Sequence, residues 1–168
     1  VLIAKEEYEK AKELLEPLVG KYPEMPEGHM NLGLAYLGLN KLDKAEGEFN
    51  EAIQLKGNYA EALNNLGKVH FLKEEYKEAE EMYNKAIKAD RYYVPAYVNL
   101  AELYEEQAEK QSKENPWKAQ DLYKEAYSIL EKCISIVGKK HARYNELLER
   151  MKSIEGQIEE TKKKLRKE

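Results

Sequence analysis

The strongest pattern in this chain is a set of apolar and small residues that recurs every 34 positions. The pair Leu32-Gly33 recurs as Leu66-Gly67 and, with Ala in place of Gly, as Leu100-Ala101. Five landmarks that follow the first pair also have counterparts 34 positions later: Tyr36, Leu42, Ala45, Phe49 and Ala52. Many residues between these landmarks are Glu or Lys. Spacing and composition together predict helical segments that repeat along the chain.

This pattern resembles the tetratricopeptide repeat, whose landmarks are Leu-Gly, Tyr, Ala, an aromatic residue, Ala and a final Pro. The resemblance implies an all-α fold, a right-handed solenoid of antiparallel helix pairs that forms a single domain over residues 1–168. We number the positions of each repeat from 1 to 34, and position 1 is Pro26, Ala60 or Val94 in the three repeats. Small residues at positions 8, 20 and 27 let helices approach closely, and large ones at 7, 11, 17 and 24 fill the spaces. The predicted segments are a truncated half repeat 1–25, repeats 26–59, 60–93 and 94–140, and a capping helix with a basic tail, 141–168.

The third repeat departs from the 34-residue period. Its first helix is predicted to begin near Val94, but the landmarks of its second helix, Tyr123 to Cys133, come 13 residues late. An antiparallel pair absorbs such an insertion by lengthening both arms, by about six or seven residues each. We predict the turn at Asn115-Pro116, with Asn as the cap and Pro in the first helical position. Trp117 lies near the tip, where we expect it to pack against the other arm; an anchor for a partner is the alternative.

The two ends of the chain carry further signals. Residues 1–11 resemble residues 69–79, which places the first residue at position 10 of a repeat and leads us to expect a natural protein with additional N-terminal sequence. After residue 140, Tyr144, Leu147 and Met151 continue the apolar spacing of a first helix, which predicts a solvating cap. The basic run 162–167 is interpreted as a solvated helix end, where cations are favoured. Contact with phosphate or acidic lipid is the alternative.

Composition and charge exclude several classes of function. The chain has a formal charge of -4 and no apolar run of about 18 residues, so we predict neither nucleic-acid binding nor membrane insertion. Cys133 is the single cysteine, which excludes an internal disulfide, and we expect it to be a small buried residue. His29 and His70 are interpreted as aromatic substitutes in packing sites. No catalytic or phosphate-binding motif is present, so we predict no enzyme, cofactor or metal. A soluble, cytoplasmic protein is favoured, although the compartment is not fixed.

Asparagine recurs at position 6 of each repeat, as Asn31, Asn65 and Asn99. Asn is a mediocre helix former, and its carboxamide offers a donor and an acceptor that match one peptide unit. The arrangement is similar to the asparagine ladders with which other members of the family hold peptide backbones. The resemblance implies that positions 2, 5, 6, 9, 12 and 13 face a concave groove. We therefore predict a peptide-binding site made of Asn31, Asn65, Asn99, Met30, Leu34, Asn64, Lys68, Val98 and Glu102, with Leu37, Glu61, Leu72 and Glu105 around it.

Alternatives remain open for these asparagines and for the function. The asparagines could instead bond across the helix stack to neighbouring repeats. Family members that clamp the C-terminal carboxylate of chaperones use Lys, Asn and Arg at several groove positions. Four of these positions hold other residues in this chain, namely Met30, Leu34, Pro95 and Asn99. Only Asn65 matches a residue of the clamp. We therefore expect a noncatalytic scaffold or adaptor that binds an extended peptide of another kind. The alternatives are a module for self-association, or a substrate-docking arm of a larger enzyme.

Overall fold

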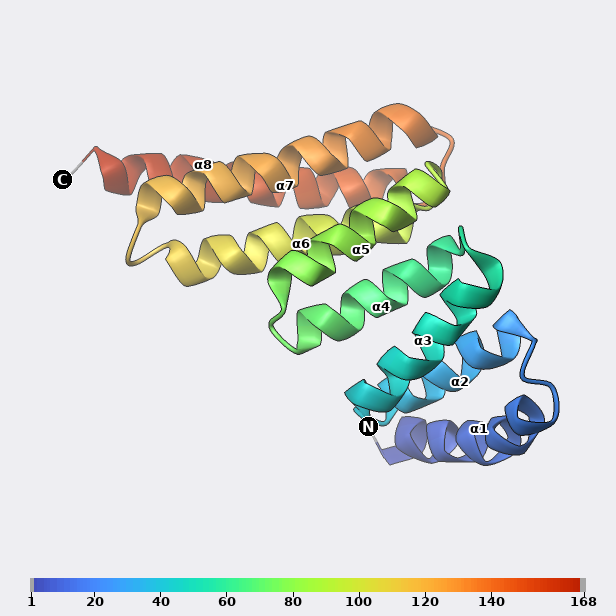
Figure 1. The fold of residues 1–168 in the computed structure, drawn as a ribbon. Coiled ribbons are helices and arrows are strands. Elements are labelled where there is room, and N and C mark those ends of the chain that lie inside the picture. Colours follow the sequence, from blue (N-terminus) through green and yellow to red (C-terminus); the bar gives the residue numbers. More distant parts are fainter. Residues whose placement is uncertain (1, 167–168) are drawn as a thin grey trace. The chain divides into compact units, whose positions relative to one another are not determined.

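The structure, a computed structural model, describes residues 2–166, and the regular structure in this range is α-helical (Figure 1). Two compact units divide between Asp90 and Arg91. Helices α1 to α5 form the N-terminal unit, and α6 to α8 form the C-terminal unit. The helices of the described range are α1 (Leu2–Lys21), α2 (Pro26–Gly38), α3 (Leu42–Lys56), α4 (Ala60–Leu72), α5 (Tyr76–Ala89), α6 (Val94–Gln111), α7 (Pro116–Val137) and α8 (Tyr144–Leu165).

The helices pack in sequential pairs, α2 against α3, α4 against α5 and α6 against α7. In the first two pairs, a glycine at position 8 lets an aromatic ring of the partner helix approach closely. A Cβ on Gly33 would lie 2.6 Å from the ring of Phe49, and one on Gly67 would lie 2.7 Å from the ring of Tyr83. Both rings are fully buried, with exposed fractions of 0 and 1%. The glycines are therefore required by packing, because any side chain at these positions would displace a core ring.

Two turns within the N-terminal unit have the same backbone geometry. Asn40 follows α2 with φ 56°, and Glu74 follows α4 with φ 60°, exactly one repeat later in the sequence. A left-handed residue just after a helix lets following N–H groups bond to the last carbonyls, as Lys41 N does to Tyr36 O and Glu75 N does to His70 O, both at 2.9 Å. The recurrence shows that the repeat fixes the turn as well as the helices.

The first helix differs from the repeat pattern. Residues 5–7 correspond to the turn residues Lys73, Glu74 and Glu75 in the likeness of residues 1–11 to residues 69–79, yet α1 is continuous from Leu2 to Lys21. In a continuous helix the backbone groups of residues 5–7 are paired within the helix, so no other element is needed to satisfy them. Helix α1 then packs against α2.

The helices of the C-terminal unit are longer than their counterparts. Helix α6 has 18 residues and α7 has 22, against 13 to 15 in α2 to α5. The turn between them is confirmed where it was predicted: Pro116 begins α7, and the Asn115 side chain accepts a hydrogen bond from Lys118 N at 3.0 Å. Helix α8, also 22 residues long, packs against α7. No helix in residues 2–166 is long and apolar enough to cross a membrane.

Two predictions about single residues of this unit have opposite outcomes. Cys133 is a free, fully buried thiol, as expected, and burial raises its pKa. Trp117 is 65% exposed, so the prediction that it packs against the other arm was wrong. The buried residues of α7, such as Ala119, Tyr123 and Leu130, lie on one face of the helix. At 100° per residue, Trp117 lies roughly 140° away from the centre of that face and cannot reach α6.

Candidate functional site

A pocket of about 300 Å³ opens on the N-terminal unit where α1, α2 and α4 meet. Its apolar lining comes from Leu34 and Leu37 of α2 and Leu72 of α4, and its polar lining from Asn65 and Lys68 of α4. Residues three or four apart share one face of a helix, so each helix presents one row of side chains to the pocket. All five were predicted as groove residues, and the structure brings them together.

Tyr8 of α1 and Gly38 at the end of α2 complete the lining of this pocket. A Cβ on Gly38 would lie 2.4 Å from the Tyr8 ring, so the glycine allows the ring to lie directly on the helix backbone. Tyr8 was not among the predicted groove residues. The available signal was Gly38 itself, because the other repeats carry Leu72 and Glu106 at this position.

The predicted asparagines have different surroundings. Asn31 is exposed on α2, and among residues 2–166 its side chain has no hydrogen-bond partner. Asn65 is half-buried, and its Nδ2 donates a long hydrogen bond of 3.9 Å to Met30 Sδ. Asn99 is half-buried on α6, in the C-terminal unit. Lys68 and Glu102 are exposed, and Leu34 is half-buried.

Position 5 of the repeat does not face a groove, which corrects part of the predicted site. Met30, Asn64 and Val98 all occupy this position, and their exposed fractions are 2, 4 and 9%. The angle around the helix does not explain this burial, because position 12, which carries the pocket residue Leu37, lies about 20° further than position 5 from the sector of positions 2, 6, 9 and 13. The side chains at position 5 are buried in the helix packing and expose little surface to a ligand.

His29 is buried, as expected for a packing site, but it also has a polar role. Its Nδ1 lies 2.7 Å from Glu48 Oε2, and its Nε2 lies 2.8 Å from the carbonyl oxygen of Pro23. Both partners are acceptors, so an imidazolium with two N–H donors satisfies them together. Burial by itself lowers the pKa of His29, but the hydrogen bonds to Glu48 and Pro23 and the charge of Glu48 outweigh it and raise the pKa above its usual value.

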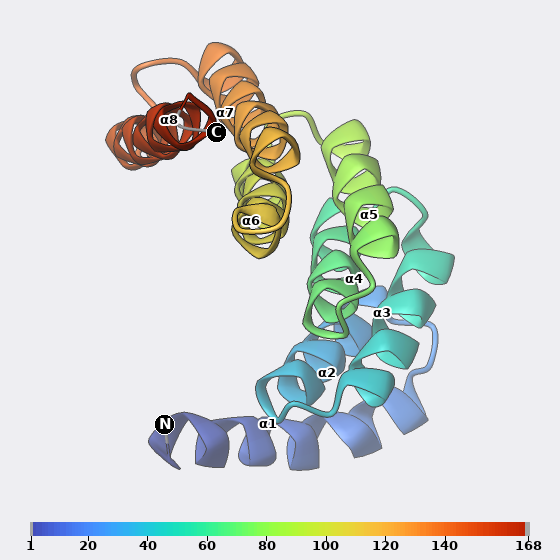
Figure 2. The same cartoon turned by 90° about the vertical axis from the view of Figure 1, so that its left-hand side faces the viewer.

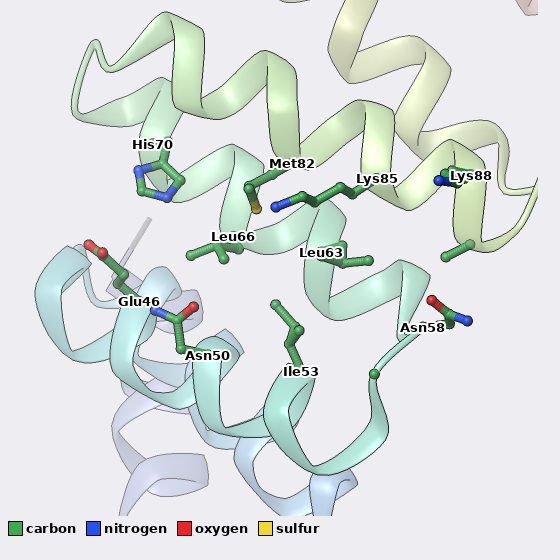
Figure 3. A pocket seen from close by; sticks show the side chains of 12 residues that line it. Glu46, Asn50, Ile53, Asn58, Leu63, Leu66, His70, Met82, Lys85 and Lys88 are labelled. Carbon is green, nitrogen blue, oxygen red and sulfur yellow. The ribbon is translucent and has the colours of Figure 1, made fainter.

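A second pocket, of about 620 Å³, lies on the same unit between α3 and α5 (Figure 3). Figure 3 shows four apolar side chains between the two helices, with the polar residues Glu46 and Asn50 on α3 and the lysines of α5 at the rim. The apolar set consists of Ile53, Leu63, Leu66 and Met82. This pocket was not predicted from the sequence. His70, at one end of it, stands where the family usually has Tyr.

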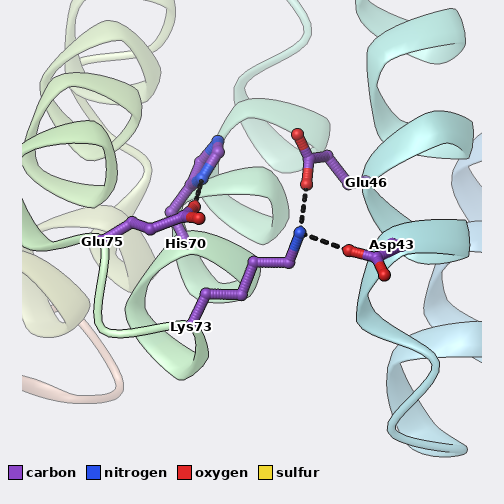
Figure 4. A network of polar contacts seen from close by, with 5 residues as sticks. All are labelled: Asp43, Glu46, His70, Lys73 and Glu75. Carbon is purple, nitrogen blue, oxygen red and sulfur yellow. Dashed lines mark hydrogen bonds and ion pairs between the residues drawn. The ribbon is translucent and has the colours of Figure 1, made fainter.

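Polar contacts near this second pocket join the two complete repeats of the N-terminal unit (Figure 4). Lys73, in the turn after α4, places Nζ 2.6 Å from both Asp43 Oδ1 and Glu46 Oε2 of α3. Its hydrogen bonds to Asp43 and Glu46 raise the pKa of Lys73 strongly. At the end of α4, His70 Nδ1 lies 2.6 Å from Glu75 Oε2, across the same turn. The Lys73 contacts hold the turn against the preceding repeat.

Among the described residues, no group of three or more His, Cys, Asp or Glu side chains is arranged to hold a metal ion. The pockets therefore offer apolar surface, carboxamides, carboxylates and lysines rather than a metal centre.

Comparison with known proteins agrees with this geometry. Two sequence families match, both described as tetratricopeptide repeat, one over residues 1–60 and one over residues 58–132. The chain therefore belongs to the tetratricopeptide repeat family. No curated protein sequence matches it.

Solved structures with a similar fold include three that differ in how much of the chain they match. The crystal structure of MamA has a TM-score of 0.60 at 21% identity and covers 95% of this chain and 93% of MamA. The first TPR of Spaghetti (RPAP3), bound to the HSP90 peptide SRMEEVD, has a TM-score of 0.58 at 23% identity and covers 64% of this chain and 92% of its own. The Sgt2 TPR domain from Aspergillus fumigatus has a TM-score of 0.58 at 25% identity, and the match covers 66% of this chain and 74% of the Sgt2 domain. The shared feature is the fold, which alone assigns no ligand.

Proposed function

We propose that this chain is a noncatalytic scaffold or adaptor that binds an extended peptide segment of a partner protein. The observation that carries the proposal is the pocket between α1, α2 and α4, where apolar leucines, a carboxamide and a lysine meet. A volume of about 300 Å³ suits the side chain of one or two residues. We infer that the pocket anchors one apolar side chain while the peptide continues along the helices.

The polar groups around the pocket specify the rest of the ligand. The Asn65 carboxamide can donate to and accept from one peptide unit, and Asn31 offers the same groups one repeat earlier. Lys68 is exposed and, among the described residues, forms no ion pair, so it favours an acidic residue next to the anchor. The proposed ligand is thus an extended segment with an apolar residue beside an acidic one.

The similar structures support this class of ligand. The RPAP3 domain is bound to the peptide SRMEEVD, in which Met precedes two Glu residues. This chain lacks most of the residues that the family uses to clamp a terminal carboxylate, so the proposal does not require the ligand to be a C-terminus. At about 0.5–1.5 kcal/mol net for each hydrogen bond, carboxamide contacts alone give weak binding, and burial of the anchor is needed to reach micromolar affinity.

Selection from a phage-displayed library of random peptides tests the proposal. We expect enriched sequences to carry an apolar residue beside Asp or Glu. For one such synthetic peptide, measured by fluorescence anisotropy, Leu34→Asp should abolish binding and Lys68→Glu should weaken it about tenfold or more, because each replaces a favourable contact by an unfavourable one.

Asn65→Ala tests the carboxamide contact, and Asn50→Ala is its matched control. Both remove one carboxamide from the N-terminal unit, but Asn50 lines the second pocket. Only Asn65→Ala should weaken the peptide, by about fivefold to tenfold. Enrichment of no sequence, or peptides that bind all variants equally, would contradict the proposal.

A second candidate function, self-association, is favoured by the outer face of α1. Leu14 is 75% exposed, and Leu18 and Tyr22 follow at four-residue spacing with exposures of 40 and 39%. Such spacing forms an apolar stripe along one side of a helix. A second copy of the chain could cover this stripe.

Self-association predicts a mass that rises with protein concentration in sedimentation velocity. Leu14→Glu together with Leu18→Glu should then yield a monomer, because charges would enter the apolar contact. Leu55→Glu, at the end of α3, changes another exposed leucine of the same unit and should not alter the mass. A wild-type monomer at high concentration would eliminate this candidate.

A further inference from the structure

The C-terminal unit brings two separate segments of sequence to one end. Helices α7 and α8 each have 22 residues and are joined by residues 138–143, so α8 returns alongside α7 and ends level with its beginning (Figures 1 and 2). Tyr123, two turns into α7, is affected by both neighbouring helices. Burial raises its pKa, and the charges of Glu109 and Glu105 on α6 and of Glu160 on α8 raise it further. The turn between α6 and α7 and the last turn of α8 therefore share one end of the unit.

The last turns at this end carry an excess of basic side chains, and five carboxylates lie within one helical turn of them: Glu106, Glu109, Asp121, Glu159 and Glu160. We call residues 110–118 and 161–166 the basic end; they contain seven Lys or Arg and one Glu. Three of the basic side chains pair with carboxylates one turn back in their own helices: Lys110 with Glu106, Lys162 with Glu159 and Lys164 with Glu160. Within residues 2–166, the remaining four form no ion pair: Lys113, Lys118, Lys163 and Arg166. Glu159 attracts Lys163 and Arg166 at a distance, but none of the four has a carboxylate of the described chain in ion-pair contact, so a negatively charged surface would stabilise them.

The basic end also carries the single tryptophan of the chain. Trp117 lies between Pro116 and Lys118 on the first turn of α7 and exposes 65% of its surface. Trp117 is thus a large, exposed aromatic side chain beside lysines that form no ion pair in the described part of the chain. Such a combination favours contact with a surface that has negative charge on the outside and an apolar layer beneath it.

We propose that the basic end binds the surface of a membrane rich in anionic phospholipids, with Trp117 at the level of the headgroups. The basic residues come from the ends of α6 and α8 and the start of α7, so they lie together at the end of a helical bundle. A flat, laterally extended surface can contact all of them at once, whereas a single peptide chain crosses only some. The proposal therefore favours a lipid surface over an acidic peptide or a nucleic acid.

The acidity of the whole chain does not oppose this docking. The formal charge of -4 is spread over the molecule, while α7 alone is about 33 Å long. Charges at the far end of the unit are thus several Debye lengths, of about 8–10 Å each, from a membrane that touches the basic end. Each basic residue near an anionic surface contributes about fivefold in affinity, so the contact is reversible and sensitive to salt.

Co-sedimentation with lipid vesicles tests the proposal, and Trp117 supplies a second, independent measurement. The intact chain should sediment with vesicles of equal parts phosphatidylcholine and phosphatidylserine, and not with phosphatidylcholine alone. Because Trp117 is the single tryptophan, its fluorescence should shift to shorter wavelength on binding. High salt should reverse both effects.

Two triple variants with the same change in charge locate the contact. Lys113→Gln, Lys118→Gln and Lys163→Gln together should weaken vesicle binding about a hundredfold, at about fivefold for each residue. Lys132→Gln, Lys139→Gln and Lys140→Gln, exposed at the other end of α7, should change it less than about twofold. Circular dichroism checks that both variants fold.

Three outcomes would overturn the proposal. The first is no binding to the phosphatidylserine vesicles, and the second is equal loss in both triple variants. The third is stronger binding and a larger fluorescence shift with polyglutamate or RNA than with vesicles, which would assign the basic end to an acidic macromolecule instead.

Discussion

Replacing Gly33 by Ala is expected to lower the free energy of unfolding of the N-terminal unit by about 1–2 kcal/mol. In an open helix the same change is favourable, by up to about 1 kcal/mol, because Ala has the higher helix propensity. Here the added Cβ would lie 2.6 Å from the buried ring of Phe49, and overpacking of a core costs about 1–3 kcal/mol. Denaturant unfolding followed by circular dichroism measures the difference.

Gly47 provides the matched control for this prediction. It lies inside α3 of the same unit, and a Cβ there would have no atom within 4 Å. Gly47→Ala should therefore stabilise the unit by about 0.5–1 kcal/mol. Destabilisation of similar size in both variants would show that packing against Phe49 is not the cause.

A double variant tests the contact directly. The third repeat has Ala101 at position 8 and Leu130 at the position that corresponds to Phe49. Combining Gly33→Ala with Phe49→Leu should cost less than the sum of the two single changes, by more than about 1 kcal/mol, because the smaller side chain makes room for the methyl group. Strict additivity would contradict the proposed clash.

Replacing His29 by Leu is expected to destabilise the same unit by about 2 kcal/mol at slightly acidic pH. The change removes both donors and leaves the carbonyl of Pro23 and the carboxylate of Glu48 without their partner in a largely buried site. Leaving such groups unsatisfied costs about 1–3 kcal/mol. The apolar volume of the side chain is nearly retained, so a small effect would show that His29 serves mainly to fill space.

The contribution of His29 depends on pH in a definite direction. Its pKa is raised in the folded protein, so its stabilising contribution is complete below the unfolded pKa of about 6.5 and is lost as the pH rises through the folded pKa. The wild type should thus lose more stability between about pH 6 and pH 8.5 than His29→Leu does. Glu48→Gln, which removes the charge but keeps a polar partner, should also reduce this loss. Parallel pH profiles of wild type and His29→Leu would contradict the assignment.

The sequence allowed α2 to α5 to be predicted because their packing depends on residues within one period. A glycine, an aromatic residue and small residues at fixed spacing describe the contact of each helix with its partner. Helix α1 could not be predicted in the same way. Residues 5–7 are identical to Lys73-Glu74-Glu75, yet the turn at residues 73–75 depends on contacts of Lys73 with α3 and of His70 with Glu75. In α1 the same three residues lie within a continuous helix.

The candidate site was predictable in part for a similar reason. The face of a helix follows from 100° per residue, which is why Leu34, Asn65 and Lys68, all predicted groove residues, line the same pocket. Whether position 5 is open or closed depends on where neighbouring helices lie, and the sequence of one helix does not contain that information. The exposure of Trp117 likewise follows from its angle around α7, which could have been derived from the buried positions of that helix.

The pairing of Gly33 with Phe49 also restricts the order in which one type of repeat can be converted into another. A chain that carries Gly and an aromatic ring can reach Ala and Leu in two steps. If the ring is replaced first, the intermediate has an unfilled space, whereas if the methyl group is added first, the intermediate has a collision at 2.6 Å. A cavity that can partly collapse is tolerated better than a collision with a fully buried ring. Substitutions between these repeat types should therefore accumulate on the second helix before the first.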